Sequence, residues 1–452
     1  MINSFFRIIK DFIFRFFNKR HLIFNDELPF WVKVPDYEER KVHITRQLAR
    51  FWDSKTTRIA IEDLPVKRKK LKYINIVPKL LPISMPNWVD GIEKDNYFYV
   101  PEEAVVENLD GFNDWEKIDW WLASFLYMEC IHERCWEYLY GPIHSYSNKL
   151  KNWDERIWNY AWVNRIAIFL SKWAAIDDSF WIKNYKFKEN IRMTHDLDAI
   201  KFTKPILIKQ ISLNLFKFFH YLIKGKFLLS YRKLKSAINF FDKEDNWNNF
   251  DEIISAERSL KIKPLVNIYA GSNYKSPLSW LLDPSYKINS IEIKNLIGRF
   301  KNEGWEIGLH PSFFSFDSKE QLFSEKKRLE KIVGKEIINV RQHWLRFSWE
   351  KTWKAQKKAG LKSDFTLMFN DRYGFRNSTA LSFSSYYESK NYKLRSSSFM
   401  DANPDRDNAF DKVVKELNAC FGETSILWHN HTLSSNFGWY RSWRRCLNIL
   451  KS

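Results

Sequence analysis

The sequence predicts an α/β fold from about residue 186 onward, behind an N-terminal α+β region. Three observations support this prediction. Short apolar runs typical of strands recur, segments with helical spacing lie between them, and aspartates or histidines stand at the ends of several runs. Alternation of strands and helices indicates a parallel sheet or barrel, in which ligands gather at the carboxyl ends of the strands.

Two domains are expected for a chain of 452 residues. Residues 1–185 are predicted to be an N-terminal α+β domain, for which the sequence indicates no role. Within it, Tyr73–Pro78 and Asn96–Pro101 have the composition of short strands that end at prolines. Residues 113–140 and 153–176 are predicted to be helices rich in aromatic side chains.

Residues 186–452 are predicted to form the sheet or barrel. Its strands are expected at five apolar runs: Ile191–Thr194, Pro264–Ala270, Gly304–His310, Ile337–Arg341 and Ser425–His429. Its helices are expected at Ser290–Asn302, Ser318–Val333 and Ser348–Ala359. Gly334 and Gly360 follow the last two helices directly, as is typical of glycines that end helices.

A basic helical insertion, at about residues 200–243, interrupts the alternation after the first strand. From Ala199 to Phe241 there is no acidic residue, whereas nine lysines and arginines occur. One interpretation is a solvated charged face. The other is a lid, or a docking surface for an anionic substrate or membrane.

The composition limits the classes of partner. There are 73 lysines and arginines against 54 acids, a net charge of +19, which favours anionic partners. Nucleic acid is not expected, because the chain has no zinc-finger, RNP or glycine-rich motif. The four cysteines have no metal-site spacing, so a reducing compartment is expected, and His132 and Cys135 are predicted to be structural.

Residues 1–20 have a mixed apolar and charged pattern. Lys10, Asp11 and Arg15 interrupt any signal-peptide core, and no apolar run is long enough to span a membrane. The segment is either an interfacial helix on an anionic membrane or a helix docked on its own protein. We therefore expect a cytoplasmic protein, and the first interpretation, together with the basic charge, would place it at the inner membrane surface.

Acids and imidazoles at the predicted strand ends have the composition of a hydrolytic metal site. Asp196 and Asp198 would project to the same side of an extended chain, so one could bind a metal and the other accept a proton. His310, His343 and His429 follow other predicted strands. Two imidazoles and a carboxylate are typical of catalytic zinc, and a further histidine can protonate a leaving group. For any one of these residues alone, a turn or a core position is the favoured interpretation.

Residues 188–435 resemble the polysaccharide deacetylase superfamily, the NodB-homology domain of carbohydrate esterase family 4. The matching motifs are Thr194–Asp198, Gly304–His310, Arg341 and Leu427–His429. Further similarity to a bacterial subgroup with a long N-terminal extension covers Arg341–Phe347, Asp364–Thr366, Gly374–Arg376, Gly141–Ser147 and Trp153–Arg165. The resemblance implies a distorted, incomplete (β/α) barrel.

The resemblance also implies residue roles. Asp196 would be the catalytic base, with Arg341 orienting it, and His429 would be the general acid. Asp198 and His310 would bind the metal. His195, His431, Asp364 and Arg376 carry no settled role: the two histidines are expected to support the site, Asp364 either approaches Arg341 or holds a turn, and Arg376 pairs with an acid in the pocket or an anionic substituent.

Two departures from the family pattern concern the metal. Phe314 occupies the position of the family's second metal histidine, and His343 stands where the third motif has proline. We hypothesise that His343 supplies the missing imidazole. The competing interpretation is a weakened or lost metal site.

The expected function is metal-dependent N-deacetylation, the removal of an acetyl group from the nitrogen of an amino sugar. The sugar is expected to belong to a bacterial surface polysaccharide or its precursor. Zinc or a similar divalent cation is the expected cofactor, and a carbohydrate is the expected substrate. Anionic membrane is a further expected contact, through residues 1–20 and the basic insertion. Two alternatives remain: an inactive glycan- or membrane-binding protein that retains the barrel, and a hydrolase of another C–N or ester bond.

Overall fold

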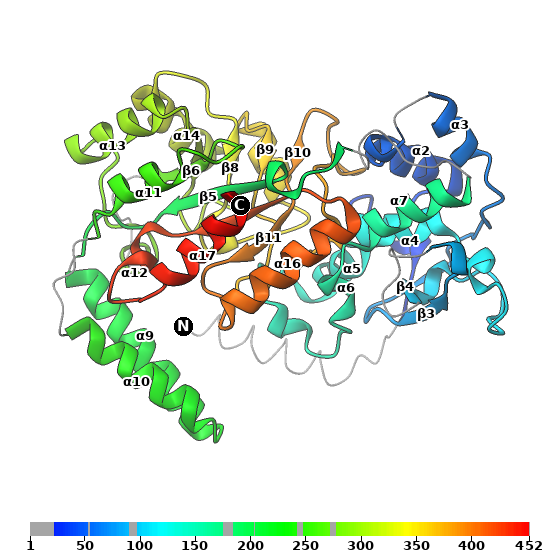
Figure 1. The fold of residues 1–452 in the computed structure, drawn as a ribbon, viewed down its shortest axis with the longest axis horizontal. Coiled ribbons are helices and arrows are strands. Elements are labelled where there is room, and N and C mark those ends of the chain that lie inside the picture. Colours follow the sequence, from blue (N-terminus) through cyan, green and yellow to red (C-terminus); the bar gives the residue numbers. More distant parts are fainter. Residues whose placement is uncertain are drawn as a thin grey trace.

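A computed structural model describes most of the chain, namely residues 22–52, 55–89, 97–174, 184–202, 204–241, 247–271 and 277–451. Figure 1 shows the N-terminal region beside a strand–helix body, with a helical hairpin extending from the other end of that body. The segment 1–20, for which an interfacial helix was considered, lies outside the described residues. No helix in the described part of the chain is long and apolar enough to cross a membrane.

An eight-stranded parallel sheet forms the centre of the body. Its order is β10-β9-β8-β7-β6-β5-β12-β11, with β10 and β11 at the two edges. The strands are β5 (Ile191–Leu197), β6 (Leu265–Tyr269), β7 (Glu306–His310), β8 (Asn339–Val340), β9 (Ser363–Asp364), β10 (Lys393–Leu394), β11 (Ser397–Met400) and β12 (Thr424–Trp428). This curled, open sheet confirms the predicted incomplete (β/α) barrel.

The strand register brings the predicted site residues together at the carboxyl end of this sheet. His195 of β5 is opposite Trp428 of β12, and Tyr269 of β6 is opposite His310 of β7. All strands run in parallel, so their carboxyl ends, which carry the polar motifs, meet at the same end of the barrel. The inner strands are buried on both faces, as expected of a parallel sheet covered by helices.

Helices cover the sheet, and three of them, α13, α14 and α15, lie where the sequence predicts helices. They are α11 (Phe250–Glu257), α12 (Pro277–Leu282), α13 (Ile291–Asn302), α14 (Lys319–Val333), α15 (Thr352–Lys358), α16 (Arg406–Cys420) and α17 (Tyr440–Lys451). Ser318 caps the first turn of α14, and Gly334 ends it with a φ of +76°. The predicted helix at Ser348 begins four residues later, at Thr352, and the backbone N–H of Trp349 donates to Glu137.

The N-terminal region contains both strands and helices, as predicted. Its elements are β1 (Leu22–Phe24), α2 (Tyr37–Gln47), α3 (Lys55–Glu62), β2 (Tyr73–Asn75), β3 (Leu80–Ser84), β4 (Tyr97–Pro101), α4 (Trp120–Met128), α5 (Ile131–Tyr140), α6 (Arg156–Asn159) and α7 (Trp162–Trp173). The helix predicted over 113–140 is wrong in its continuity. Cys130 adopts a left-handed conformation, with a φ of +50°, and separates α4 from α5.

The N-terminal region shares one hydrophobic core cluster with part of the barrel, while a second cluster fills the rest of the barrel. Trp120 and Trp162 belong to the same cluster of buried side chains as Phe347 and Trp353. Buried ion pairs also join the two parts: Glu133 to Arg376 at 2.8 Å, and Arg165 to Glu416 at 2.7 Å. Arg376 therefore pairs with the N-terminal region. The domain boundary at residue 185 remains a prediction.

The basic insertion forms two paired helices, α9 (Lys204–Ile223) and α10 (Phe227–Phe241). Figure 1 shows this pair extending away from the sheet. The helical character predicted for the insertion is confirmed, and its function is considered below.

Candidate active site

Three predicted metal ligands converge at the carboxyl end of the sheet. Asp198 follows β5, His310 ends β7, and His343 opens a short 3₁₀ turn after β8. One ligand atom from each lies within 4.8 Å of the other two. Asp198 Oδ1 is 3.2 Å from His310 Nε2 and 3.6 Å from His343 Nε2. This geometry brings the two imidazoles to a single carboxylate oxygen.

The Asp198 carboxylate has the environment of a cation ligand. Its Oδ1 is buried and accepts no hydrogen bond among the described residues. Burial would raise the pKa of Asp198, but His310, His343 and His429 outweigh it and hold that pKa well below its usual range. A buried, ionised oxygen that faces two ring nitrogens fits a divalent cation.

Each of the imidazole rings of His310 and His343 is oriented by an oxygen atom close to its Nδ1. His310 Nδ1 lies 2.7 Å from the carbonyl oxygen of Arg341, which can only accept, so Nδ1 carries the proton. His343 Nδ1 lies 3.4 Å from Asp283 Oδ1. Both contacts leave Nε2 directed toward Asp198, the arrangement found when a second residue orients a metal-binding histidine.

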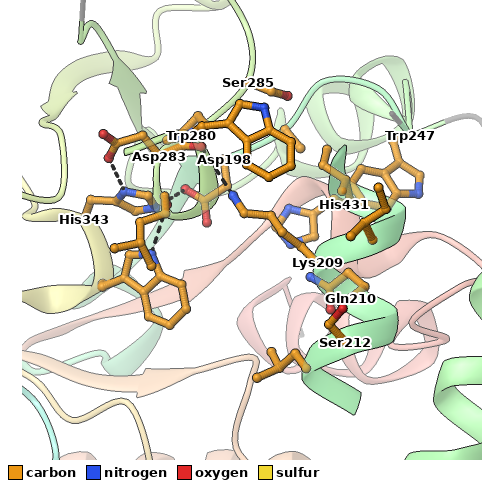
Figure 2. A pocket seen from close by; sticks show the side chains of 17 residues that line it. Asp198, Lys209, Gln210, Ser212, Trp247, Trp280, Asp283, Ser285, His343 and His431 are labelled. Carbon is orange, nitrogen blue, oxygen red and sulfur yellow. Dashed lines mark hydrogen bonds and ion pairs between the residues drawn. The ribbon is translucent and has the colours of Figure 1, made fainter. Parts of the chain in front are cut away.

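Asp283 is a site residue that sequence analysis missed. It follows α12 and also accepts a hydrogen bond from the backbone N–H of Phe313 at 2.7 Å. Figure 2 shows it beside His343, on the side away from Asp198. The local sequence, aspartate followed by Pro284, is that of an ordinary turn, so it carries no signal for this contact.

Asp196 lies beside the metal group, within a hydrogen-bond network. Its Oδ1 accepts from Arg341 Nη1 at 3.2 Å and from Asn267 Nδ2 at 2.8 Å. Arg341 is fixed in turn by Thr194 Oγ1 at 2.8 Å and by the carbonyl of Phe365 at 3.0 Å. Burial opposes ionisation of Asp196, but His310 and Arg341 outweigh it and lower its pKa, so it is a carboxylate at neutral pH.

Gly308 makes room for the Asn267 contact. The two residues are opposite each other in β7 and β6, and a Cβ on Gly308 would lie 2.3 Å from Asn267 Oδ1. A side chain at position 308 would therefore displace the amide that holds Asp196. Gly308 belongs to the motif that ends at His310, whereas Asn267 was missed, because a single asparagine within an apolar strand does not indicate a site.

His429 is held by a second buried carboxylate, Asp401. His429 Nδ1 lies 2.9 Å from Asp401 Oδ1, while Oδ2 accepts from the His429 backbone N–H at 2.8 Å and from Thr432 Oγ1 at 2.7 Å. Burial would lower the pKa of His429, but Asp401, Asp198 and Asp196 raise it to about 10. His429 Nε2 is 3.6 Å from Asp198 Oδ2. The imidazolium thus directs a proton toward the metal group.

Sequence analysis also missed Asp401, although a signal was present. Asp401 follows β11 directly, as Asp198 follows β5. The strand itself, Ser397–Met400, is short and rich in serine and was not recognised.

The remaining motif residues lie outside the metal group. Phe314 is 40% exposed and packs against Phe313 at a ring separation of 5.0 Å. Asp364 accepts from Trp353 Nε1 at 2.9 Å and from Thr366, which supports the turn interpretation. His195 Nε2 pairs with Glu257 at 2.9 Å. A phenyl ring has no ligand atom, and His343 is the second imidazole that lies close to Asp198.

A cavity of about 440 Å³ opens beside the metal group. Figure 2 shows Asp198 and His343 on one side of it and α9 on the other. Trp247, Trp280 and Trp344 contribute aromatic surface, and Lys209 of α9 extends into it. A concave, mostly apolar pocket beside a few converging polar groups is typical of a ligand site.

Comparison with known proteins identifies related folds among solved structures. No protein-family model matches the chain, and no curated protein matches it. Several solved structures match, and those described below bear names of polysaccharide deacetylases or carbohydrate esterase family 4 proteins. They include a candidate polysaccharide deacetylase from Mycobacterium smegmatis, with 14% identity and a TM-score of 0.34 over 58% of this chain and 83% of that chain.

Two further matches are the carbohydrate esterase family 4 pseudoenzyme BA3943 of Bacillus anthracis and a mutant of it. The wild type is 7% identical, with a TM-score of 0.29 over 58% of this chain and 60% of that chain. The mutant, described as having restored enzymatic activity, is 9% identical, with a TM-score of 0.29 over 58% and 62%. The present chain thus covers less than two thirds of the length of these two proteins.

Proposed function

We propose that this chain is a metal-dependent deacetylase of the carbohydrate esterase family 4 type, which removes an N-acetyl group from an amino sugar. One observation carries the proposal. Asp198, His310 and His343 converge beside Asp196 and His429, two groups suited to accept and donate protons, at the edge of a cavity. The family motifs occur at the same strand ends.

Asp198, His310 and His343 would hold a divalent cation, which we propose to be zinc. The donor set fits, because two imidazole nitrogens and one carboxylate oxygen leave a position open for water or substrate. When bound, such a cation lowers the pKa of water and polarises a carbonyl group. Asp283 would keep the His343 ring in the binding orientation.

Asp196 would act as the base. It would take a proton from the attacking water while the water oxygen adds to the acyl carbon. Arg341 and Asn267 bind the same carboxylate oxygen, Oδ1, and so fix the orientation of the group. Because Arg341 also stabilises the ionised form, Asp196 is in the proton-accepting state at neutral pH.

His429 would act as the acid. As the C–N bond breaks, its Nε2 proton would pass to the departing nitrogen, so that acetate and a free amine leave the site. Asp401 maintains the imidazolium and fixes the ring through Nδ1. At one pH, therefore, Asp196 is deprotonated and can act as the base, while His429 is protonated and can act as the acid.

The cavity would hold the sugar. Trp280 and Trp344 offer flat apolar faces next to Asp198 and His343, which suits the apolar face of a sugar ring. We propose a carbohydrate substrate of a surface polysaccharide or its precursor. The cytoplasmic location expected from the sequence also remains a proposal, which fractionation of the native host would test.

Acetate release tests this function. We expect the purified full-length protein to release acetate from an N-acetylated hexosamine oligomer, to lose that activity with a chelator, and to regain it with zinc. Release only from O-acetylated saccharides would indicate the alternative ester hydrolysis. A protein with far less than one metal per chain and no release from either substrate would be the inactive binding protein.

A further inference from the structure

The α9–α10 insertion is a projecting helical hairpin. Its turn, Lys224–Lys226, includes Gly225 with a φ of +65°. Ser230 Oγ donates to the carbonyl of Phe218 at 2.9 Å, and Lys226 N–H donates to that of Tyr221 at 2.9 Å. The 20 residues of α9 span about 30 Å. Figure 1 shows the turn at the end farthest from the sheet.

The base of the hairpin is anchored on the body. Phe240 and Trp247 are buried together, and Phe240 packs against Phe437 at a ring separation of 5.2 Å. Trp247 Nε1 donates to Asn436 Oδ1 at 3.0 Å. These contacts involve the last turn of α10 and Trp247, and among the described residues no hydrogen bond, ion pair or ring contact joins the tip, Leu222–Leu229, to the body.

The far half exposes a cluster of large apolar side chains. Ile223 is 86% exposed, Phe227 70% and Leu228 64%. Other exposed members are Phe216, Phe219, Leu222, Leu229 and Tyr231. Scattered apolar residues on a surface are ordinary, but eight large apolar side chains exposed within residues 216–231 are typical of an interaction site.

The positive charge around this cluster indicates the class of partner. Lys217, Lys224, Lys226, Arg232 and Lys233 lie among or next to the exposed apolar side chains, and the hairpin has no acidic residue. A second copy of the same surface would be repelled by these cations. A polyanion such as nucleic acid would bind the cations but leave Ile223 and Phe227 in water. An anionic lipid surface satisfies both groups, because acyl chains take up the apolar tip while headgroups pair with the lysines.

We propose that the hairpin inserts its tip, Leu222–Leu229, into the headgroup and upper acyl region of an anionic membrane. This inference is independent of the proposed chemistry. It has a consequence for the cavity, since Ile208, Lys209 and Gln210 of α9 also line it. The helix that reaches the lipid thus forms one wall of the candidate substrate pocket.

Vesicle flotation of the full-length protein tests the proposal with a matched pair of variants. The tip variant carries Ile223→Ser and Phe227→Ser. The control carries Ile291→Ser and Phe112→Ser, which are 69% and 75% exposed elsewhere on the surface. With phosphatidylcholine–phosphatidylglycerol vesicles, we expect wild type and control to float and the tip variant to bind about tenfold more weakly. Equal binding of the tip variant, or absence of wild-type binding, would overturn the proposal.

A fluorescent label separates tip insertion from binding through another segment. The four native cysteines are buried, so Ile223→Cys and Ile291→Cys each offer one accessible thiol for an environment-sensitive dye. We expect a blue shift on adding anionic vesicles only for the label at 223, and a smaller shift with phosphatidylcholine alone. No shift at 223 would overturn the proposal. So would a lipid-free dimer that the tip variant abolishes, because a second copy would then cover the tip.

Discussion

His343 Nδ1 lies 3.4 Å from Asp283 Oδ1, while Nε2 of the same ring lies 3.6 Å from Asp198 Oδ1. The ring therefore lies between two carboxylates. Asp283 orients the ring, and Asp198 would bind the same metal ion as the ring. This relationship explains how a chain with Phe314 in place of the family's second histidine can still present two imidazoles.

Removal of His343 tests its proposed role as a ligand. We expect His343→Ala to weaken zinc binding by about two orders of magnitude or more, since removing even a supporting residue costs ten- to a hundredfold. Competition with a chromophoric chelator measures the affinity. His220→Ala, a change of the same kind on exposed α9, is the control and should bind as wild type. Unchanged affinity in His343→Ala would show that the site does not use it.

Asp283 should act through the orientation of His343. We expect Asp283→Asn to lower zinc affinity by about ten- to a hundredfold, because the amide supports the imidazole less well than the carboxylate does. Asp26→Asn, which alters an exposed carboxylate, should have no effect. An Asp283→Asn protein that folds normally and binds zinc as tightly as wild type would contradict the orienting role.

Arg341 should determine the acid side of the pH–activity profile. It helps to lower the pKa of Asp196, and the base works only when ionised, so activity is lost as the pH falls through that pKa. Arg341→Met removes the positive charge and should raise the pKa, shifting the acid limb to higher pH and reducing the maximal rate. Acetate release measured across pH would show this. An acid limb at the wild-type position would contradict it.

Asp401 should determine the alkaline side. It contributes to raising the pKa of His429 to about 10, and the acid works only when protonated, so activity is lost as the pH rises through that pKa. Asp401→Asn should lower the pKa and move the alkaline limb to lower pH. Because Asp401 is fully buried, near-ultraviolet circular dichroism should accompany the assay. A folded variant with an unchanged alkaline limb would exclude this role.

Glu133 should stabilise the junction between the N-terminal region and the barrel. Glu133→Gln leaves Arg376 buried without its carboxylate, which typically costs about 3–5 kcal/mol. Urea unfolding should show this loss in a single transition, because the two parts share a core. Glu320→Gln, in an exposed pair, should change stability by less than about 1 kcal/mol. Two separate transitions in the wild type would contradict the shared core.

The sequence predicted the parts of the fold whose signals are local. Strands β6, β7 and β12 are apolar runs, and α14 has both a Ser318 cap and a Gly334 stop. Strands β9 and β10 have only two residues each, too few to show any periodicity. Their place is set by neighbouring strands rather than by their own side chains.

The candidate site likewise contains residues that the sequence could predict and residues that it could not. Asp196, Asp198, His310 and His429 stand in motifs at strand ends and could be singled out. Asp283 could not be singled out, because its contact in the site, His343, is 60 residues away in the sequence. The role of such a residue follows from the fold and not from its neighbours in the chain.

A crystal structure of the zinc-loaded protein tests the central claim most directly. The account predicts one ion bound by an Asp198 oxygen and by Nε2 of both His310 and His343, at about 2.0–2.2 Å. An ion that leaves His343 unbound, or a site that stays empty at saturating zinc, would contradict it.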